Sequence, residues 1–358
     1  LRINPAGIGV YRSSEFTITP SFSYTKSLSK TNDLTNPTSR EDFQPEFNLN
    51  NAGFVGTFES DNASGWVSTH FGISYNRSRD YHANFSLEGL NENNSYADYF
   101  LSMANGVNLN NLSPFYEGLA YDAYLIDTVG NTYTYDTPVA ADASGNFSPI
   151  SQEQTVRIDG HKNEYTFSFG ANYSHKLYLG ASFGIHRMNY SRSTVHSELA
   201  SDANYQAHGF DSFDFRKEYE TDGKGYTFKI GGIYRPIDMV RIGAAVHLPT
   251  TFSFTDQYSH RMSSYFDTMK VENLKPYDYQ NNREIDEAES KYEVTTPMKL
   301  VGSVAFQFEK LALLSIDYEY MDYSRIRMRD DGSGYDYTPV NDNIKQTYQA
   351  VSNIRVGG

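Results

Sequence analysis

Apolar and polar residues alternate along much of the chain. In the stretch 165–173 every second residue is aromatic or Ala, and the residues between them are small or polar. The same period of two recurs at 177–186, 240–248 and 311–320. Because successive side chains of a strand point to opposite faces of the sheet, this pattern predicts β-strands with one apolar face.

The pattern predicts ten strands whose connections alternate in length. We expect the strands at residues 15–26, 51–59, 66–88, 153–174, 177–195, 213–235, 240–260, 286–308, 311–328 and 351–358. Short links are expected at 61–65, 175–176, 236–239 and 309–310, and long ones at 27–50, 89–152, 196–212, 261–285 and 329–350. Short turns at one end and long loops at the other are typical of an outer-membrane β-barrel. A soluble β-sandwich, the alternative, has no reason to segregate its loop lengths in this way.

The predicted fold class is therefore all-β, a transmembrane antiparallel outer-membrane β-barrel. Strands longer than the ~10 residues that cross a bilayer at a tilt are expected to project beyond its outer surface. Residues 15–358 form the barrel in this interpretation, with a long extracellular loop at 89–152. Bacterial barrels close with an even number of strands, and the last predicted strand stops at Gly358, so we expect C-terminal strands to be missing from this chain.

Composition agrees with a barrel and excludes other classes. The chain has 30 Tyr and 23 Phe, and its mean hydropathy is −0.59. Many aromatic residues in a hydrophilic chain are expected for a barrel, which has aromatic girdles on its outer surface and a polar interior. A net charge of −14 excludes nucleic acid as a partner. With no Cys, and with no HExxH, GxSxG or P-loop motif, we expect neither an enzyme nor a metal or cofactor site.

An ordered series of short segments resembles a known family. The segments are Asn4-Pro5-Ala6-Gly7 ahead of the first strand, RIGAA at 241–245 with Leu248-Pro249, TPMKLVGSVAF at 296–306 with 313–324, and NDNIK at 341–345 leading into 353–357. Together they resemble the FadL family of outer-membrane transporters of long-chain fatty acids and other hydrophobic compounds. The resemblance implies a fourteen-stranded barrel, of which about ten strands are present here. It also implies an N-terminal hatch in the lumen, and lateral release of ligand through a gap at a kinked third strand.

Two features are assigned by this resemblance. Residues 1–14 are the end of the hatch, most of which lies upstream, and Asn4, Pro5, Ala6 and Gly7 are its motif. Pro5 and Gly7 are expected to keep the motif irregular. Gly72 is the candidate for the kink in the third strand. The alternative is that Gly72 accommodates a bulky neighbour in the lumen.

The long loop 89–152 contains the best candidates for ligand binding. Its aromatic and aliphatic residues follow helical spacing in two places, which predicts two short amphipathic helices. An apolar groove between them would bind a hydrophobic ligand; the candidates are Tyr99, Phe100, Leu101, Met103, Phe115, Tyr116 and Leu119. The alternative is that the helices pack on each other and only cap the barrel.

Charged residues of the polar faces are candidates for binding a carboxylate head group. His186 and Lys229 have the parity of the lumen face, whereas Arg187 and Arg192 depend on a bulge near Met188. The alternative is a set of lumen salt bridges to Asp317 and Glu319. The stretch 329–336 has a calcium-loop composition without the spacing of an EF-hand, so a solvated acidic loop is favoured.

The leading functional hypothesis is passive transport of hydrophobic compounds, such as long-chain fatty acids, across the outer membrane of a Gram-negative bacterium. Its partners are outer-membrane lipid or lipopolysaccharide and a hydrophobic small molecule, and the protein is expected to be a monomer. The alternative is a non-conducting, FadL-like accessory protein of outer-membrane secretion or lipopolysaccharide handling, with a secretion-system subunit as partner. An open general porin is disfavoured by the predicted hatch.

Overall fold

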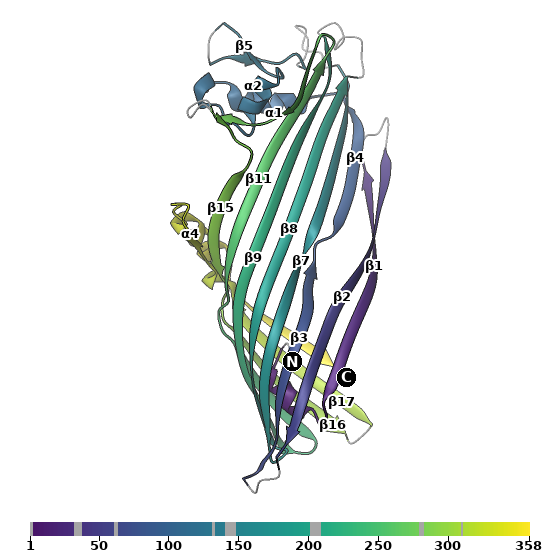
Figure 1. Cartoon of the computed structure of the whole chain (residues 1–358), viewed down its shortest axis with the longest axis vertical. Helices are drawn as coiled ribbons and strands as arrows, with labels where there is room; N and C mark the ends of the chain where they lie inside the picture. Colours follow the sequence, from purple (N-terminus) through teal and green to yellow (C-terminus); the bar gives the residue numbers. More distant parts are fainter. Residues whose placement is uncertain are drawn as a thin grey trace.

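Long antiparallel strands form one curved sheet with a small helical cap at one end (Figure 1). The computed structural model describes residues 3–31, 38–60, 64–130, 133–139, 148–200, 209–278, 283–308 and 311–358. The predicted link at 309–310 and most of the link at 61–65 lie outside these ranges. Within them, none of the helices has the length and apolar character to span a membrane.

Ten strands follow one another in the sheet in the order β1-β2-β3-β7-β8-β9-β10-β16-β17-β19. Each neighbouring pair is antiparallel. Their bounds are β1 Glu15–Lys30, β2 Ser39–Glu59, β3 Trp66–Asp80, β7 Ile150–Tyr173, β8 Leu177–Ala200, β9 Phe210–Ile237, β10 Val240–His247, β16 Lys299–Phe308, β17 Ala312–Asp322 and β19 Ala350–Gly357.

Shorter strands continue this sheet towards the cap. They are β4 Ala83–Asn91, β11 Thr251–Phe266, β12 Met269–Leu274, β15 Ala288–Thr295 and β18 Arg327–Asp330, and two-stranded pairs form from β5 Asp127–Thr128 with β6 Tyr135–Asp136 and from β13 Tyr277–Asp278 with β14 Arg283–Glu284. The helices are η1 Pro5–Val10, α1 Tyr96–Ala104, η2 Leu109–Asn111, α2 Glu117–Asp122, η3 Tyr323–Arg325 and α4 Thr338–Thr347.

The fold class predicted from the sequence, the antiparallel sheet of an outer-membrane β-barrel, is confirmed, and the ten predicted strands correspond to the ten of the sheet. Four of the predicted strands are interrupted, at 81–82, 248–250, 296–298 and 323–326. Pro249 and Pro297 lie in two of these interruptions. Proline has no N–H to give to a ladder, which explains a break at each of them.

The predicted long loop at 27–50 was wrong, because most of it is strand. β1 continues to Lys30 and β2 already begins at Ser39, and the two pair over this whole length. Their register shifts between Thr19 and Pro20, so the side chains of β2 exchange faces near Asn50. This exchange of faces, together with Pro45 and the charges around it, hides the alternation of 39–49 from a reading of the sequence.

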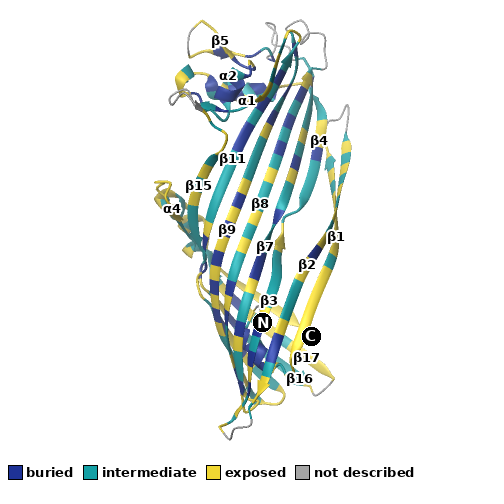
Figure 2. Cartoon of the chain, viewed as in Figure 1, coloured by how far each residue is buried: buried dark blue, intermediate teal, exposed yellow. Residues whose placement is uncertain are grey.

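A belt of exposed apolar side chains covers part of the outer face of the sheet. Figure 2 marks the exposed positions of the strands in yellow. On β7 the belt runs from Tyr165 to Tyr173, close to the ~9–11 residues with which a tilted strand crosses a bilayer. Its last row towards the cap is Tyr165, Ile185 and Tyr226, which lie opposite one another in register, and the next row is Asn163, Arg187 and Lys224. The strands therefore project beyond an apolar belt with a sharp polar edge.

We predict that the belt tolerates charge far less well than the strands above it. Phe169 is 59% exposed near the middle of the belt on β7, so Phe169→Arg is expected to destabilise the folded protein in lipid vesicles by about 2–4 kcal/mol. Ser193→Arg, on β8 above the belt, is the matched control and is expected to cost less than about 1 kcal/mol. Unfolding by denaturant in vesicles measures both values. Equal effects of the two substitutions would contradict a lipid-facing belt.

Candidate functional site

The N-terminal segment lies against the inner face of the sheet. η1 packs on β3, β7, β8 and β9, and His247 of β10 contacts the carbonyl oxygen of Ile3 through Nε2 at 2.7 Å. The Asn4 side chain donates to the carbonyl oxygens of Gly232, at 3.2 Å, and Ala244, at 3.3 Å. Three neighbouring strands, β8 to β10, therefore hold the predicted hatch motif.

The seat of this segment is a row of glycines. Gly170, Gly180 and Gly231 lie opposite one another on β7, β8 and β9. A Cβ at Gly180 would lie 2.4 Å from the carbonyl oxygen of Pro5, and one at Gly170 would lie 2.3 Å from Ile8 Cγ2. Any side chain in this row would collide with η1, so the row defines which face of each strand is the inner one.

Two expectations about this region were wrong. The motif is not irregular, because Pro5 opens a 3₁₀ helix whose first turn is capped by the Asn4 side chain, which accepts from Ala6 N at 3.0 Å. Gly72 is not at a kink, because it pairs regularly with Val55 and Ser168 on its two sides. A Cβ there would lie 2.9 Å from Ile8 Cδ1. Gly72 thus accommodates a bulky lumen neighbour, as the alternative proposed.

A cavity of 370 Å³ lies beside η1 on the inner face of β1, β2, β3 and β7. Its lining combines apolar surface, such as that of Phe54, Val55 and Ile73, with hydroxyl and amide groups from Thr17, Thr19, Asn51, Ser74, Asn76, Thr166 and Ser168. Lys229 also lines it, and its Nζ contacts Glu164 Oε1 at 2.8 Å. The lower lumen therefore presents many polar groups, and its buried cation is already neutralised by a carboxylate.

The four polar lumen candidates fall in different places. Lys229 pairs with Glu164, and His186 Nε2 lies 3.9 Å from the same carboxylate, so the predicted partners Asp317 and Glu319 were wrong for these two residues. Glu319 pairs instead with Lys299 and Arg355. No register shift is present at Met188 of β8, so Arg187 lies on the outer face and Arg192 shares the inner face with His186.

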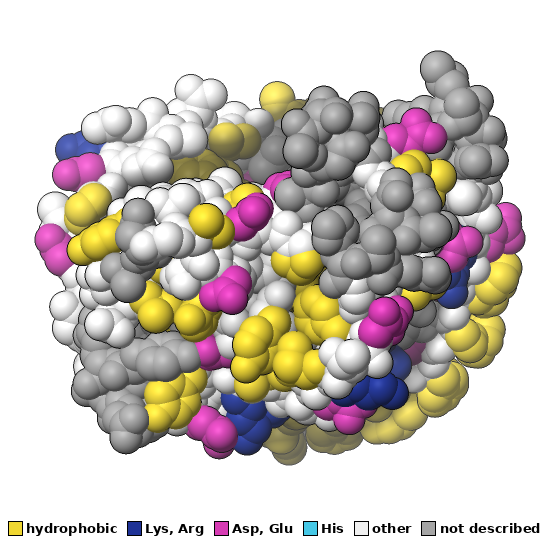
Figure 3. Space-filling model, turned by 90° about the horizontal axis from the view of Figure 1, so that it is seen from above, with side chains coloured by type: hydrophobic (Ala, Val, Ile, Leu, Met, Phe, Trp, Pro, Cys, Tyr) yellow, Lys and Arg dark blue, Asp and Glu magenta, His cyan; other side chains and the backbone are white. Residues whose placement is uncertain are grey.

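The cap is built from the predicted loop helices. α1 and α2 pack on each other and on the upper strands around a core that includes Phe100, Leu119, Phe213, Phe215 and Met262. Of the seven ligand candidates, Phe100 and Leu119 are fully buried in this core, and Leu101 and Tyr116 pack against it. Tyr99 remains 45% exposed. Figure 3, the view from above, shows hydrophobic and acidic side chains next to one another at this end of the molecule. The described conformation is thus the capping arrangement, and ligand binding by these residues stays a prediction.

Glu198 of β8 anchors the cap to the wall. Its buried carboxylate accepts from Ser95 Oγ, from Tyr96 N at 2.7 Å and from Gln152 Nε2 at 2.7 Å. His196 Nε2 lies 3.0 Å from the same group. A carboxylate at the N-terminus of α1 also complements the helix dipole. No sequence pattern indicated this anchor, because Glu198 lies in the stretch 196–212 that was predicted to be a loop.

An aromatic cluster lines the underside of the cap. His260 of β11 donates from Nδ1 to the carbonyl oxygen of Phe115 at 2.7 Å, and its ring centroid lies 4.9 Å from that of Tyr116 and 5.4 Å from that of Phe215. Lys217 Nζ lies over the rings of Tyr96 and Phe215. Burial lowers the pKa of Lys217, as the nearby Arg192 charge also does. The upper lumen is therefore aromatic and cationic, where the lower lumen is polar.

The wall has a seam between β2 and β4. Backbone pairing of β2 with β3 covers Asn51–Glu59 only, and β4 pairs with β7 alone. Among the described residues, side chains of β2 bridge the gap instead: Arg40 to Glu88 and Glu153, Asp42 to Ser86, Gln44 to Asp159, Glu46 to Arg77 and His82, and Asn48 to Asp80. The outward side chains of β2 remain apolar along the seam, as Phe43, Phe47 and Leu49. The seam therefore borders the apolar belt.

The acidic stretch 329–336 forms a self-contained turn. The Asp330 carboxylate accepts from the backbone N–H groups of Gly332, Ser333 and Gly334 at 3.1, 2.9 and 2.9 Å. These bonds, with that of the Ser333 hydroxyl the strongest influence, lower the pKa of Asp330 to about 2. The Asp330 oxygens thus accept hydrogen bonds from the N–H groups of their own loop, which agrees with the solvated acidic loop favoured from the sequence.

Comparison with known proteins finds structural likeness alone. No protein-family model matches the chain, and no curated protein matches its sequence. Solved structures that it resembles include the crystal structure of the toluene transporter TodX from Pseudomonas putida, at a TM-score of 0.40 and 12% identity over 92% of this chain and 68% of that one. Another is the TodX deltaS2S3 mutant, a monoaromatic hydrocarbon channel, at 0.40 and 12% over 90% and 64%. Likeness at this level says nothing of what the chain binds or moves.

We predict that a side chain at Gly180 expels η1 from its seat. Ala6 of η1 is fully buried, and the chain has no Cys, so Ala6→Cys provides a single reporter that maleimide should label slowly. Adding Gly180→Val is expected to make labelling fast, because the new Cβ overlaps Pro5. Gly232→Val is the matched control, since its Cβ would make only ordinary contacts, with Leu179 Cδ2 at 3.6 Å and the Tyr178 carbonyl oxygen at 3.8 Å. Unchanged protection in the Gly180 variant would contradict the seat.

We predict that acid loosens the cap through His260. Burial lowers the pKa of His260 from its ordinary value of 6.5, despite the opposing effect of the Phe115 carbonyl. The open state therefore binds a proton more readily than the closed one, so cap stability is complete above pH 6.5 and falls as pH drops towards the lowered pKa. Hydrogen exchange of α2, corrected for its intrinsic pH dependence, measures this. His260→Phe keeps the ring packing and should abolish the pH dependence; persistence in that variant would assign it to another group.

Proposed function

We propose that this chain belongs to an outer-membrane protein of a Gram-negative bacterium that moves hydrophobic compounds from the cap side of the lumen laterally into the membrane. The observation that carries the proposal is the seam between β2 and β4, where the wall lacks backbone pairing beside the apolar belt. An apolar molecule needs such an exit, because the lower lumen is polar and η1 lies across it.

Entry is proposed at the underside of the cap. The rings of Tyr96, Phe115, Tyr116 and Tyr258 face the upper lumen together with Lys217. Below them Phe254 and Phe252 stack on one another over Gly223 and Gly225, whose missing side chains leave room for the rings. Aromatic surfaces of this kind bind apolar molecules. They give a hydrophobic ligand contacts along the lumen between the cap and the level of the seam.

No covalent step is needed for such transport, so the proposal is non-enzymatic. Long-chain fatty acids and small aromatic hydrocarbons are the two compound classes with which to begin. The lumen rings suit either class, and Arg192 and Lys217 offer charges to a carboxylate. These two residues, with the seven loop candidates, are the proposed contacts for substrate.

The test closes the seam covalently. Asp42 and Ser86 face each other across it, with Asp42 Oδ2 accepting from Ser86 N at 2.8 Å. In a full-length protein whose only cysteines are the introduced pair, we expect oxidised Asp42→Cys/Ser86→Cys to block uptake of labelled oleate and toluene, and reduction to restore it. Uptake is measured in vesicles that contain the protein, with binding measured separately in detergent.

The control pair is Thr155→Cys/Val195→Cys, whose positions lie opposite each other on β7 and β8 in a continuous ladder. Oxidation of this pair is expected to leave uptake unchanged. Uptake that survives closure of the seam would contradict lateral release while leaving transport intact. Absence of saturable binding for every compound would contradict transport itself, and would favour the accessory role in secretion or lipopolysaccharide handling.

A further inference from the structure

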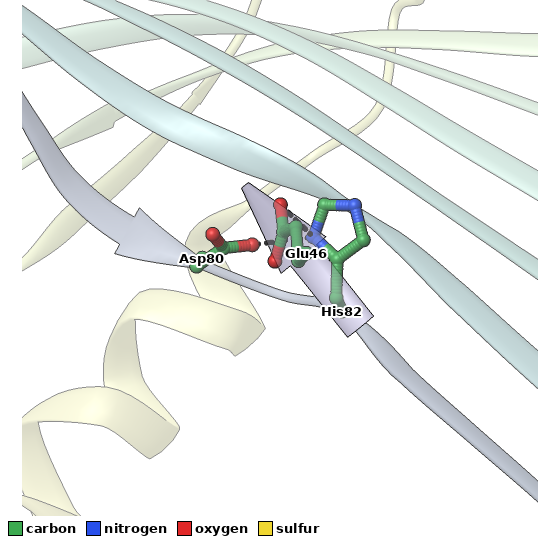
Figure 4. A group of neighbouring side chains, drawn as sticks. All are labelled: Glu46, Asp80 and His82. Carbon is green, nitrogen blue, oxygen red and sulfur yellow. Dashed lines mark hydrogen bonds and ion pairs between the residues drawn. The ribbon is translucent and has the colours of Figure 1, made fainter. Parts of the chain in front are cut away.

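The seam contains a cluster of three side chains of metal-ligating type. Glu46 comes from β2, Asp80 from the end of β3, and His82 from the two-residue break before β4. Their carboxylate oxygens and the imidazole Nδ1 all lie within 4.8 Å of one another. Figure 4 shows the two carboxylates and one nitrogen of the imidazole directed towards one another. The three residues join strands that no backbone ladder joins at this height.

Both nitrogens of His82 face carboxylates. Nδ1 lies against Asp80 and at 3.2 Å from Glu46 Oε1, and Nε2 lies 3.4 Å from Asp159 Oδ1. A neutral imidazole has a single N–H, so it can donate to a carboxylate from only one of its nitrogens. When Nε2–H serves Asp159, the Nδ1 lone pair and the oxygens of Glu46 and Asp80 point at one another. A cation between them removes this repulsion.

Arg77 supplies part of the positive charge that the cluster needs. Its Nη1 lies 3.4 Å from Glu46 Oε1 and 3.4 Å from Asp80 Oδ2, and it also contacts Asn48. A third carboxylate, that of Asp159, pairs through its other oxygen with the largely exposed Arg157. The half of the cluster around Glu46 and Arg77 is well shielded, with side-chain exposures of 17% and 16%. The two arginines leave one of the three carboxylates without a balancing guanidinium.

The surroundings of His82 are those of a metal-bound histidine. Metal-ligating imidazoles generally give their second nitrogen to a carboxylate, which fixes the ring and its tautomer. Asp159 holds this place, and Gln44 in turn approaches it with Nε2 at 3.5 Å. The buried Oε1 of the same Gln44 has no hydrogen-bond partner. The residue that approaches Asp159 thus retains an acceptor oxygen without a partner.

We propose that Glu46, Asp80 and His82 bind a divalent transition-metal ion that fastens β2 to the break between β3 and β4. One imidazole nitrogen with two carboxylates suits Zn²⁺, which takes nitrogen and oxygen ligands at ~2.0–2.2 Å, better than the oxygen-only sites of Ca²⁺ or Mg²⁺. Asp159 orients His82, and Arg77 opposes the ion by its charge. The site is independent of any transported compound. No short sequence motif marks this metal site, because its three ligands come from separate segments of the chain.

The test is a Zn²⁺ titration of the full-length protein, purified in detergent and stripped with chelator. We expect one Zn²⁺ per chain, loss of that stoichiometric site in His82→Ala, and a roughly 10–100-fold weaker site in Asp159→Asn. Arg77→Gln is expected to bind Zn²⁺ more tightly, since it removes a competing positive charge. Hydrogen exchange across 81–91 should slow on addition of Zn²⁺ to the parent protein and not to His82→Ala.

Glu88→Gln is the matched control, because Glu88 crosses the same seam through Arg40 and lies outside the cluster. It should leave Zn²⁺ affinity unchanged. Absence of a stoichiometric site, or binding that survives His82→Ala, would overturn the proposal and leave the cluster as a proton- and arginine-mediated ion pair. Because the readouts are binding and exchange rather than uptake, a failure here is separate from a failure of the transport proposal.

Discussion

The rest of the structure depends on the close packing of η1 against a row of glycines on the inner face of the sheet. Gly170, Gly180 and Gly231 each lower the intrinsic stability of a strand by roughly 0.5–1 kcal/mol relative to Ala. They occur in one row because the backbone at Pro5 and the side chains of Asn4 and Ile8 occupy the space their side chains would fill. Once that row is fixed as the inner face, the period of two assigns every other residue of these strands to lumen or exterior.

Strand length then separates the two ends of the lumen. Gly180 contacts η1 and Glu198 anchors the cap, and both lie on the inner face of β8. At about 3.3 Å per residue, the eighteen-residue interval places them about 60 Å apart. The apolar belt accounts for only part of this length, so the cap stands well clear of it. In the proposed transport, a molecule captured under the cap would travel most of its path within the projecting strands, past the rings of Tyr190, Tyr219, Phe254 and Phe252.

The alternation of apolar and polar residues predicted the strands and helices, but it did not predict contacts between residues that are distant in the sequence. The ten strands and two cap helices were predicted because each carries its pattern in a continuous stretch of sequence. The alternation along β9 placed Lys229 on the lumen face correctly. It could not show which residue of another strand lies beside Lys229, because that depends on the register between strands. The predicted carboxylate partners were therefore wrong, and Glu164 is the partner. The break at 81–82 has no proline or glycine to mark it. The anchor at Glu198 and the cluster at His82 were equally invisible, because each joins residues that only the register brings together.

The seam is held by a different kind of bond from the joint between β7 and β8. A continuous ladder joins β7 to β8 over their whole length, whereas β2 and β4 are joined by side chains such as Arg40 with Glu88 and Asn48 with Asp80. Exposed ion pairs contribute about 0–1 kcal/mol each, and they can separate without leaving buried peptide groups unsatisfied. Opening a ladder of equal length would break many peptide hydrogen bonds together. Opening of the wall therefore costs less free energy between β2 and β4 than along a ladder of equal length. The proposed metal ion at Glu46, Asp80 and His82 would add a bond at this weaker joint, where one bond has the largest relative effect on the free energy of opening.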